Sequence, residues 1–257
     1  MESKKVFFSQ IGEDVLIYNN FINKYREDGT YVEIGGSDGV ELSNSKFFHD
    51  NLGFRGLLVE PVPHFFNQLK VNRPNDVCVN CAVDYKEGVQ KFLGHSHVAG
   101  IENYLSPILK DKYLKNANTW LIRTYPMSKV ISHAGLKYID YFSIDVEGAE
   151  LAILETIDWS IPIYLITIEL NEKVTENDKN GLIKNEKCRD ILRKNGFRFL
   201  KQIDINEFWI NDNYFRKDLL YDKNVKQFKT LREAGLFKSI GNHVVKDIQD
   251  NLNMRNI

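Results

Sequence analysis

The sequence predicts one α/β domain with a mostly parallel sheet of seven strands, helices on both faces and an antiparallel pair at one edge. Three observations support this class. Apolar runs typical of strands alternate along the chain with stretches of helical spacing. Glycine or proline stands at several boundaries between them. The 257 residues, 43% hydrophobic and 27% charged, suit one globular domain with a sizeable core.

The first half of the sheet is predicted from alternating helices and strands. The apolar spacing of residues 13–25 predicts a helix that ends at Asp28-Gly29, before a strand at 30–36. A helix at 43–53 follows, with Ser43 or Ser45 as its N-cap and Gly53 as its stop. The next predicted elements are a strand at 55–61, a helix at 63–73 and a strand at 76–83.

The second half continues this alternation. A strand at 138–148 precedes a helix at 149–158, and a strand at 161–170 precedes a helix at 186–196 that ends at Gly196. Two short runs, 197–203 and 206–211, then predict a hairpin. Such a hairpin would add an antiparallel edge to an otherwise parallel sheet.

Two regions do not fit the alternation. Residues 90–136 form an insertion longer than one crossover helix needs, which is typical of a lid or a substrate loop. Residues 216–257 form a charged extension with apolar residues at helical spacing. We predict a domain over residues 1–215 and an extension that packs on it, covers its site or pairs two subunits into a homodimer.

Composition and charge argue against several classes of partner. The formal net charge of −1 provides no general attraction to nucleic acid or to an acidic membrane. No apolar run approaches the length of a membrane span, and the first residues lack the apolar stretch of a signal peptide. Three cysteines are too few for a disulfide framework and suit a reducing compartment. We therefore expect a cytoplasmic protein that binds neither nucleic acid nor membranes.

Cys78 and Cys81 have the C-x-x-C spacing of some metal and redox sites. They lie in an apolar run with strand composition, where residues three apart point to opposite faces. No second pair completes a zinc site, and no helix signal follows directly. Packing in the core is the preferred interpretation.

A glycine-rich turn follows the strand at 30–36, where Gly35, Gly36 and Gly39 leave the backbone bare. In a doubly wound sheet, this first turn approaches the ligand closely. Glu60 closes the next strand about 20 residues after the last glycine, which is the position of an acidic residue that binds a ribose diol. Together these residues predict a ligand that contains adenosine, either NAD or S-adenosylmethionine.

The carboxylates near the turn favour S-adenosylmethionine. Glu33 and Asp38 would repel the pyrophosphate of a dinucleotide, whereas they suit a ligand with a sulfonium and an amino group. An NAD-dependent oxidoreductase is the alternative enzyme. A non-catalytic module that binds S-adenosylmethionine or carbohydrate is the alternative without catalysis.

Six motifs follow one another between Phe7 and Ile210: FFSQIGED, YVEIGGSDGVELSNSKFF, GLLVEPVPHFFNQLKVNRP, NCAVD, IDYFSIDVEGAELAIL and ITIELNE. With these motifs, the chain resembles the FkbM family of S-adenosylmethionine-dependent methyltransferases. The resemblance implies a Rossmann-like class I methyltransferase fold and methyl transfer to oxygen, commonly on sugars or other small hydroxylated compounds. Glu33 and Gly36 stand where many members have aspartate and alanine, which is a conservative departure.

The resemblance also implies where the cofactor and the acceptor bind. The residues expected around the cofactor are Gln10, Glu33, Gly35, Gly36, Asp38, Gly39, Glu60, Pro61, Cys81, Ala82 and Asp145. Asp84 is expected near the adenine with Cys81 and Ala82, and Asp14 is expected to close the pocket with Gln10. Asp145 and Glu147 would face the sulfonium and the acceptor as catalytic residues, although Asp145 also suits a helix cap.

Neighbouring strand ends predict a metal site. Glu169 and Asn171 are two residues apart and share one face of an extended chain, and Asp145 ends the neighbouring strand. Three such oxygen ligands suit Mg²⁺, which would lower the pKa of a substrate hydroxyl. Hydrogen bonds from Glu169 and Asn171 to the acceptor are the alternative.

The insertion carries His95 and His97, and His97 is predicted as a general base. A histidine in a loop is more often structural or exposed. Tyr104, Trp120 or Tyr125 in the same insertion is expected to pack on a sugar face. The function predicted from the sequence is therefore S-adenosylmethionine-dependent O-methylation of a sugar or glycan hydroxyl.

Overall fold

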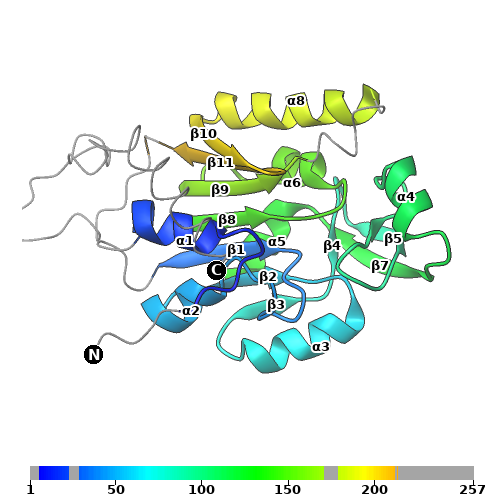
Figure 1. Cartoon of the computed structure of the whole chain (residues 1–257), viewed down its shortest axis with the longest axis horizontal. Coiled ribbons are helices and arrows are strands. Elements are labelled where there is room, and N and C mark those ends of the chain that lie inside the picture. Colours follow the sequence, from blue (N-terminus) through cyan, green and yellow to red (C-terminus); the bar gives the residue numbers. More distant parts are fainter. Residues whose placement is uncertain (1–5, 23–28, 171–178, 212, 214–257) are drawn as a thin grey trace, which may run out of the picture.

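The computed structural model describes residues 6–22, 29–170, 179–211 and 213. Its central sheet has seven strands in the order β10-β11-β9-β8-β1-β2-β3 (Figure 1). These are β1 (Thr30–Ile34), β2 (Arg55–Val59), β3 (Val77–Val79), β8 (Ile139–Ile144), β9 (Ile163–Glu169), β10 (Phe197–Ile203) and β11 (Asn206–Asn211). The strands from β9 to β3 run parallel, whereas β11 is antiparallel to both neighbours. The predicted mostly parallel sheet with an antiparallel edge is confirmed.

Helices cover both faces of this sheet. One face packs against α5 (Met127–Ala134), α6 (Glu150–Thr156) and α8 (Lys179–Lys194) through a largely aliphatic cluster. The other face packs against α1 (Glu13–Ile17), the π-helical segment η1 (Tyr18–Ile22), α2 (Lys46–Leu52) and α3 (Pro63–Asn72) through a more aromatic one. Alternation along β1 explains the two sets, because Val32 belongs to the first cluster and Tyr31 to the second. None of the described helices is long and apolar enough to cross a membrane.

Helix ends differ in detail from the sequence prediction. The helix expected at 13–25 is α-helical only to Ile17 and then π-helical to Ile22, and residues 23–28 lie outside the described part. Ser45 takes the N-cap position of α2, but the hydroxyl of Ser43 accepts the Lys46 N–H at 3.2 Å. Gly53 ends this helix as predicted.

The strand expected at 76–83 is two strands in different sheets. β3 ends at Val79 in the central sheet, and β4 (Ala82–Val83) belongs to a second sheet. Between them, the amide of Asn80 donates to the carbonyls of Glu60 and Pro61, which turns the chain. The apolar pattern continues through the turn because both strands are covered, so periodicity alone predicted one strand. Cys78, Cys81 and Cys188 are all free thiols, and the last two are buried in the core.

The predicted insertion contains most of the second sheet. Its strands are β4, β5 (Gly88–Leu93), β6 (Gly100–Ile101) and β7 (Thr119–Tyr125), in the order β4-β7-β5-β6. α4 (Pro107–Tyr113) lies between β6 and β7, and these elements stand beside one end of the central sheet (Figure 1). α5, at the end of the predicted insertion, packs on the central sheet. The predicted extension at 216–257 lies outside the described residues.

Candidate functional site

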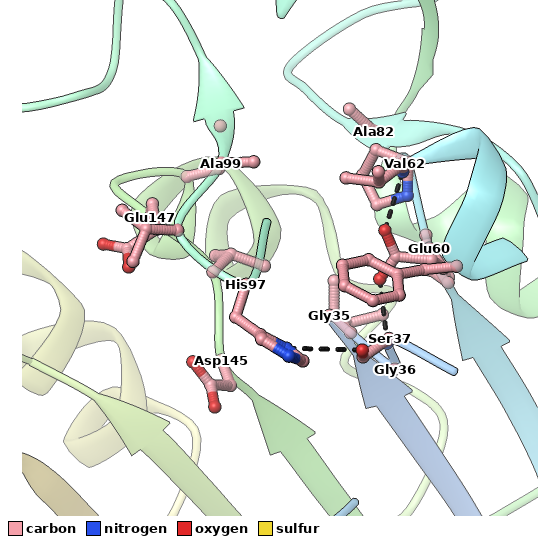
Figure 2. Close-up of a pocket in the computed structure, with 18 of the residues that line it drawn as sticks. Gly35, Gly36, Ser37, Glu60, Val62, Ala82, His97, Ala99, Asp145 and Glu147 are labelled. Atoms are coloured by element: carbon pink, nitrogen blue, oxygen red, sulfur yellow. Dashed lines mark hydrogen bonds between the residues drawn. The ribbon is translucent and has the colours of Figure 1, made fainter. Parts of the chain in front are cut away.

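A cavity of about 380 Å³ lies where the carboxyl ends of β1, β2 and β8 meet the second sheet (Figure 2). Most of the residues predicted for the site line it: Gln10, Gly35, Gly36, Glu60, Pro61, Cys81, Ala82, His97, Asp145, Glu147 and Glu169. They come from seven separate segments of the chain. Parallel strands place their carboxyl ends along one edge, so the motifs meet there although they are far apart in sequence.

The glycine turn after β1 needs a bare backbone. Gly35 has φ +86°, and a Cβ atom there would lie 2.1 Å from the carbonyl oxygen of Asp145. The N–H groups of Gly35 and Gly36 both donate to the Val59 carbonyl, at 2.9 and 3.2 Å. The turn therefore holds the ends of β1, β2 and β8 against one another, and no side chain separates them from the cavity.

Glu60 joins the glycine turn to the end of β2. One carboxylate oxygen accepts the Ser37 N–H at 2.8 Å, and the other accepts the Val62 N–H at 2.6 Å. The residue is only 4% exposed, and this burial raises the pKa of its carboxyl to about 7, against the effect of the two hydrogen bonds. Each oxygen can accept a second hydrogen bond, so Glu60 can still bind a hydroxyl in the cavity.

His97 reaches into the cavity from the loop between β5 and β6. Its Nδ1 lies 3.3 Å from the hydroxyl of Ser37, and its ring lies 4.9 Å from that of Phe65. Figure 2 shows the imidazole pointing toward Ser37, with Asp145 on its other side. The loop of the second sheet therefore contacts the glycine turn across the cavity.

Three carboxyl groups gather where β8 and β9 end. Asp145 and Glu169 share a hydrogen bond, and burial raises the pKa of both. Burial also raises the pKa of Glu147 to about 8, with contributions from Asp145 and Glu150, whereas Lys184 acts in the opposite direction. These groups therefore retain protons at a pH where ordinary carboxyls are ionised.

The predicted metal site includes two of these carboxyls, those of Asp145 and Glu169. Asn171, its third ligand, lies outside the described residues. Among the residues that the structure describes, no group of three His, Cys, Asp or Glu side chains could hold a metal ion. The Mg²⁺ site at Asp145, Glu169 and Asn171 stays a prediction.

The chain matches the family model described as "Methyltransferase FkbM domain" over residues 33–199. It belongs to this family. The carboxyl cluster, the glycine turn and the second sheet all fall within the matched range.

Comparison of this FkbM domain with solved structures finds other methyltransferases. Aeropyrum pernix fibrillarin, solved with natively bound S-adenosyl-L-methionine, is 12% identical, with 77% of this chain and 71% of that chain covered and a TM-score of 0.41. Precorrin-6y C5,15-methyltransferase from Geobacter metallireducens is 13% identical, with coverages of 82% and 90% and a TM-score of 0.40. No curated protein matches this chain. The class I methyltransferase fold itself is evident from the strand order and direction of the central sheet.

A second cavity, of about 450 Å³, adjoins the first in this FkbM domain. Glu147, Glu169 and Leu109 line both. The remaining wall comes from α4, the turn before it and the starts of α6 and α8, and it includes Tyr104, Ser106, Lys110, Glu150, Asn180 and Lys184. Lys184 forms an ion pair with Glu150. Of the three aromatic residues expected near a sugar, Tyr104 lines this cavity, whereas Trp120 and Tyr125 line neither.

Three residues predicted to surround the cofactor line neither cavity: Glu33, Asp38 and Gly39. Glu33 is 3% exposed and accepts hydrogen bonds from the loop that follows the glycine turn. Asp38 accepts the N–H groups of Val40 and Glu41, each at 2.8 Å. These side chains shape the turn from its outer side.

Asp14, expected to close the pocket, and Asp84, expected near the adenine, also line neither cavity of this FkbM domain. Asp14 accepts the Phe8 N–H at 2.6 Å and the Ser9 N–H at 3.2 Å. Asp84 accepts the hydroxyl of Tyr104 at 2.5 Å and the amide of Gln90 at 2.8 Å. The first fixes the N-terminal segment, and the second fixes the turn that bears Tyr104.

Several lining residues were missed by the sequence analysis: Ser37, Leu42, Val62, Phe65, Ile101 and Tyr113. Ser37 and Phe65 carry a local signal, because one lies inside the glycine turn and the other lies one helical turn after Pro61. Ile101 and Tyr113 carry none, since only the folding of the second sheet brings them to the cavity.

Proposed function

We propose that this FkbM methyltransferase binds S-adenosylmethionine in the first cavity and methylates a hydroxyl of a sugar held in the second. The sugar is free, nucleotide-linked or part of a glycan. One observation carries the proposal: Glu147 and Glu169 line both cavities. A methyl group that leaves one ligand for the other must pass where the two cavities meet, and these carboxyls stand there.

The first cavity fits the cofactor by its charge as well as by its shape. Glu60 is suited to hold the ribose hydroxyls, and Ala82 and Phe65 offer apolar surface for the adenine. Among the described lining residues there is no lysine or arginine. A pyrophosphate would lack a cationic partner there, whereas a positively charged sulfonium suits the carboxyls, so NAD is disfavoured.

S-adenosylmethionine, when bound, supplies a methyl group on a positively charged sulfur. The protein must then hold the acceptor oxygen in line with that methyl group and remove the hydroxyl proton. Glu147 suits the second task, because its pKa of about 8 lies near neutral pH and its carboxylate is held where the cavities join. His97, on the side of Ser37, is the other candidate base.

The second cavity fits a polyhydroxylated acceptor. Its wall offers amide, hydroxyl and carboxyl groups from Asn103, Ser106, Glu147 and Asn180, which can bind several hydroxyls at once. Tyr104 and Leu105 add the apolar surface on which a sugar ring packs. A purely aromatic acceptor would leave this polar lining without partners.

The test is methyl transfer from labelled S-adenosylmethionine to a panel of glycans, nucleotide sugars, lipids, protein and RNA. We expect label on a sugar oxygen, and a loss of roughly 10²–10⁴-fold in kcat for Glu147→Gln, with affinity retained for S-adenosylhomocysteine, which carries no sulfonium charge. Glu87→Gln, at an exposed carboxylate paired with Lys129, is the matched control. Label only on RNA, protein or nitrogen would refute the sugar assignment.

The predicted Mg²⁺ is tested in the same assay. If Asp145, Glu169 and Asn171 hold a metal ion, excess EDTA abolishes turnover and leaves cofactor binding intact. Full activity in EDTA would leave these residues as groups that hydrogen-bond the acceptor.

A further inference from the structure

Arg73 follows α3 and is completely buried. Its guanidinium uses all three nitrogens. Nε donates to the Gly39 carbonyl at 2.7 Å, and Nη2 donates to the hydroxyls of Ser43 and Ser45 at 2.8 and 3.1 Å. Nη1 donates to the hydroxyl of Tyr31 at 2.7 Å. The side chain therefore binds both ends of the segment from Gly39 to Ser45.

Glu33 and Asp76 supply the negative charge for this buried cation. Glu33 lies 3.9 Å from Arg73 and accepts the Ser43 hydroxyl at 2.9 Å, the Asn44 N–H at 2.7 Å and the Ser45 hydroxyl. Asp76 accepts from Arg73 at 3.3 Å. The buried side chains of Glu33 and Arg73 thus bind the same segment, and neither lines the first cavity.

The opposite side of that segment lines the cavity, through Glu41, Leu42 and Ser43. Its backbone is strained: Leu42 has φ 58°, a value that non-glycine residues rarely adopt. Gly39 has φ +78°, and a Cβ atom there would lie 2.9 Å from Cγ of Arg73. Such a backbone persists only where its surroundings hold it, and here they are the contacts of Arg73 and Glu33.

We propose that Arg73 is a positioning residue for cofactor binding, which holds the segment from Gly39 to Ser45 in the shape of the cavity wall. This rests on the proposed binding of S-adenosylmethionine in the first cavity. Lysine cannot replace arginine in this role. The guanidinium reaches Gly39, Ser43, Ser45 and Tyr31 from three nitrogens in one plane, whereas an ammonium donates from a single point.

The test measures binding of S-adenosylhomocysteine by calorimetry to folded Arg73→Lys protein. We expect the Kd to rise by roughly tenfold or more. Amide hydrogen exchange should quicken at Val40, Glu41 and Asn44, while the amides of β8 and β9 stay protected. Ser45→Ala, which removes one acceptor of Arg73 without touching the cavity, should give a smaller change in the same direction.

Arg189→Lys is the matched control. Arg189 donates to Glu207 at 2.9 and 2.7 Å on the α8 side of the sheet and lines neither cavity. It should lower stability without changing the Kd. An unchanged Kd in both Arg73→Lys and Ser45→Ala would overturn the positioning role, whereas a wild-type protein that does not bind S-adenosylhomocysteine would overturn the proposed function itself.

Discussion

Two groups of carboxylates flank the first cavity: Glu33 and the side chain of Asp76 are buried beside a cation, whereas Asp145, Glu147 and Glu169 are open to solvent or half-buried near one another. On the outer side of the glycine turn, Glu33 and Asp76 surround the guanidinium of Arg73. On the acceptor side, Asp145 and Glu169 face each other, and Glu147 stands beside them with Lys184 paired to Glu150.

The difference separates structural from functional carboxylates. The outer group satisfies its charges with a cation and hydroxyl donors, as a buried polar network requires for stability. The acceptor group contains like charges that cannot all ionise together, an arrangement that costs stability and is common at active sites. Sequence alone does not separate the two, because both groups lie at strand ends.

Replacement of Arg73, the cation of the outer group, should cause the largest loss of stability. Arg73→Met would leave Glu33 and Asp76 without the guanidinium that balances their charge, and we expect a loss of about 3–5 kcal/mol in the free energy of unfolding. Urea denaturation at neutral pH measures it. Glu147→Gln serves as the comparison, and it should not destabilise the protein, since glutamine is neutral without having to take up a proton on folding at neutral pH. An equal loss in the two variants would erase the distinction between the groups.

Replacement of Glu60, on the cavity side of the glycine turn, should have a smaller effect, which is on ligand affinity rather than on stability. Glu60→Ala removes a charge-assisted contact to the ribose diol, which should weaken binding of S-adenosylhomocysteine by about 1.5–3 kcal/mol. Calorimetry on the folded variant tests this. Unchanged affinity would remove Glu60 from the cofactor site and leave it as a support for Ser37 and Val62.

The pH dependence of stability should show a third and smaller effect, which comes from the acceptor-side carboxyl of Glu147. The folded-state pKa of Glu147, about 8, lies above its ordinary value of 4.5, so the folded protein binds this proton more tightly than the unfolded chain does. Its contribution is fully present below pH 4.5 and is lost as the pH rises toward 8. Glu147→Gln should therefore flatten the fall in stability between these values, in urea titrations at several pH values. Parallel curves for the two proteins would contradict the raised pKa.

The sequence predicted the site best where a required backbone conformation and a functional side chain occur close together along the chain. Gly35, Gly36 and Glu60 could be placed from the turn and the strand end, because a bare backbone and an acidic residue at that spacing have one common use. The sequence did not show whether the side chain of Glu33 enters the cavity. Alternation along a strand defines two faces, but it does not say which face meets the cavity. Arg73 gave no signal, because its partners come from three separate parts of the chain.

The second sheet illustrates the other limit. The apolar run at 76–83 does not reveal that the chain leaves one sheet for another at Asn80, because apolar residues continue on both sides of the turn. Cys81 and Ala82 were nevertheless assigned to the site, because the resemblance fixes residues by motif rather than by strand.

The turn at Asn80 also limits which segments of this protein could be replaced by those of a relative. Asn80 is fastened to Glu60 and Pro61, and Ala82 both lines the cofactor cavity and begins the second sheet. The graft point of the acceptor-side module therefore lies inside the cofactor site. A chimera with a borrowed second sheet would keep this part of the cavity wall only if it kept the junction from Asn80 to Ala82, so the second sheet cannot be exchanged here without a piece of the first cavity.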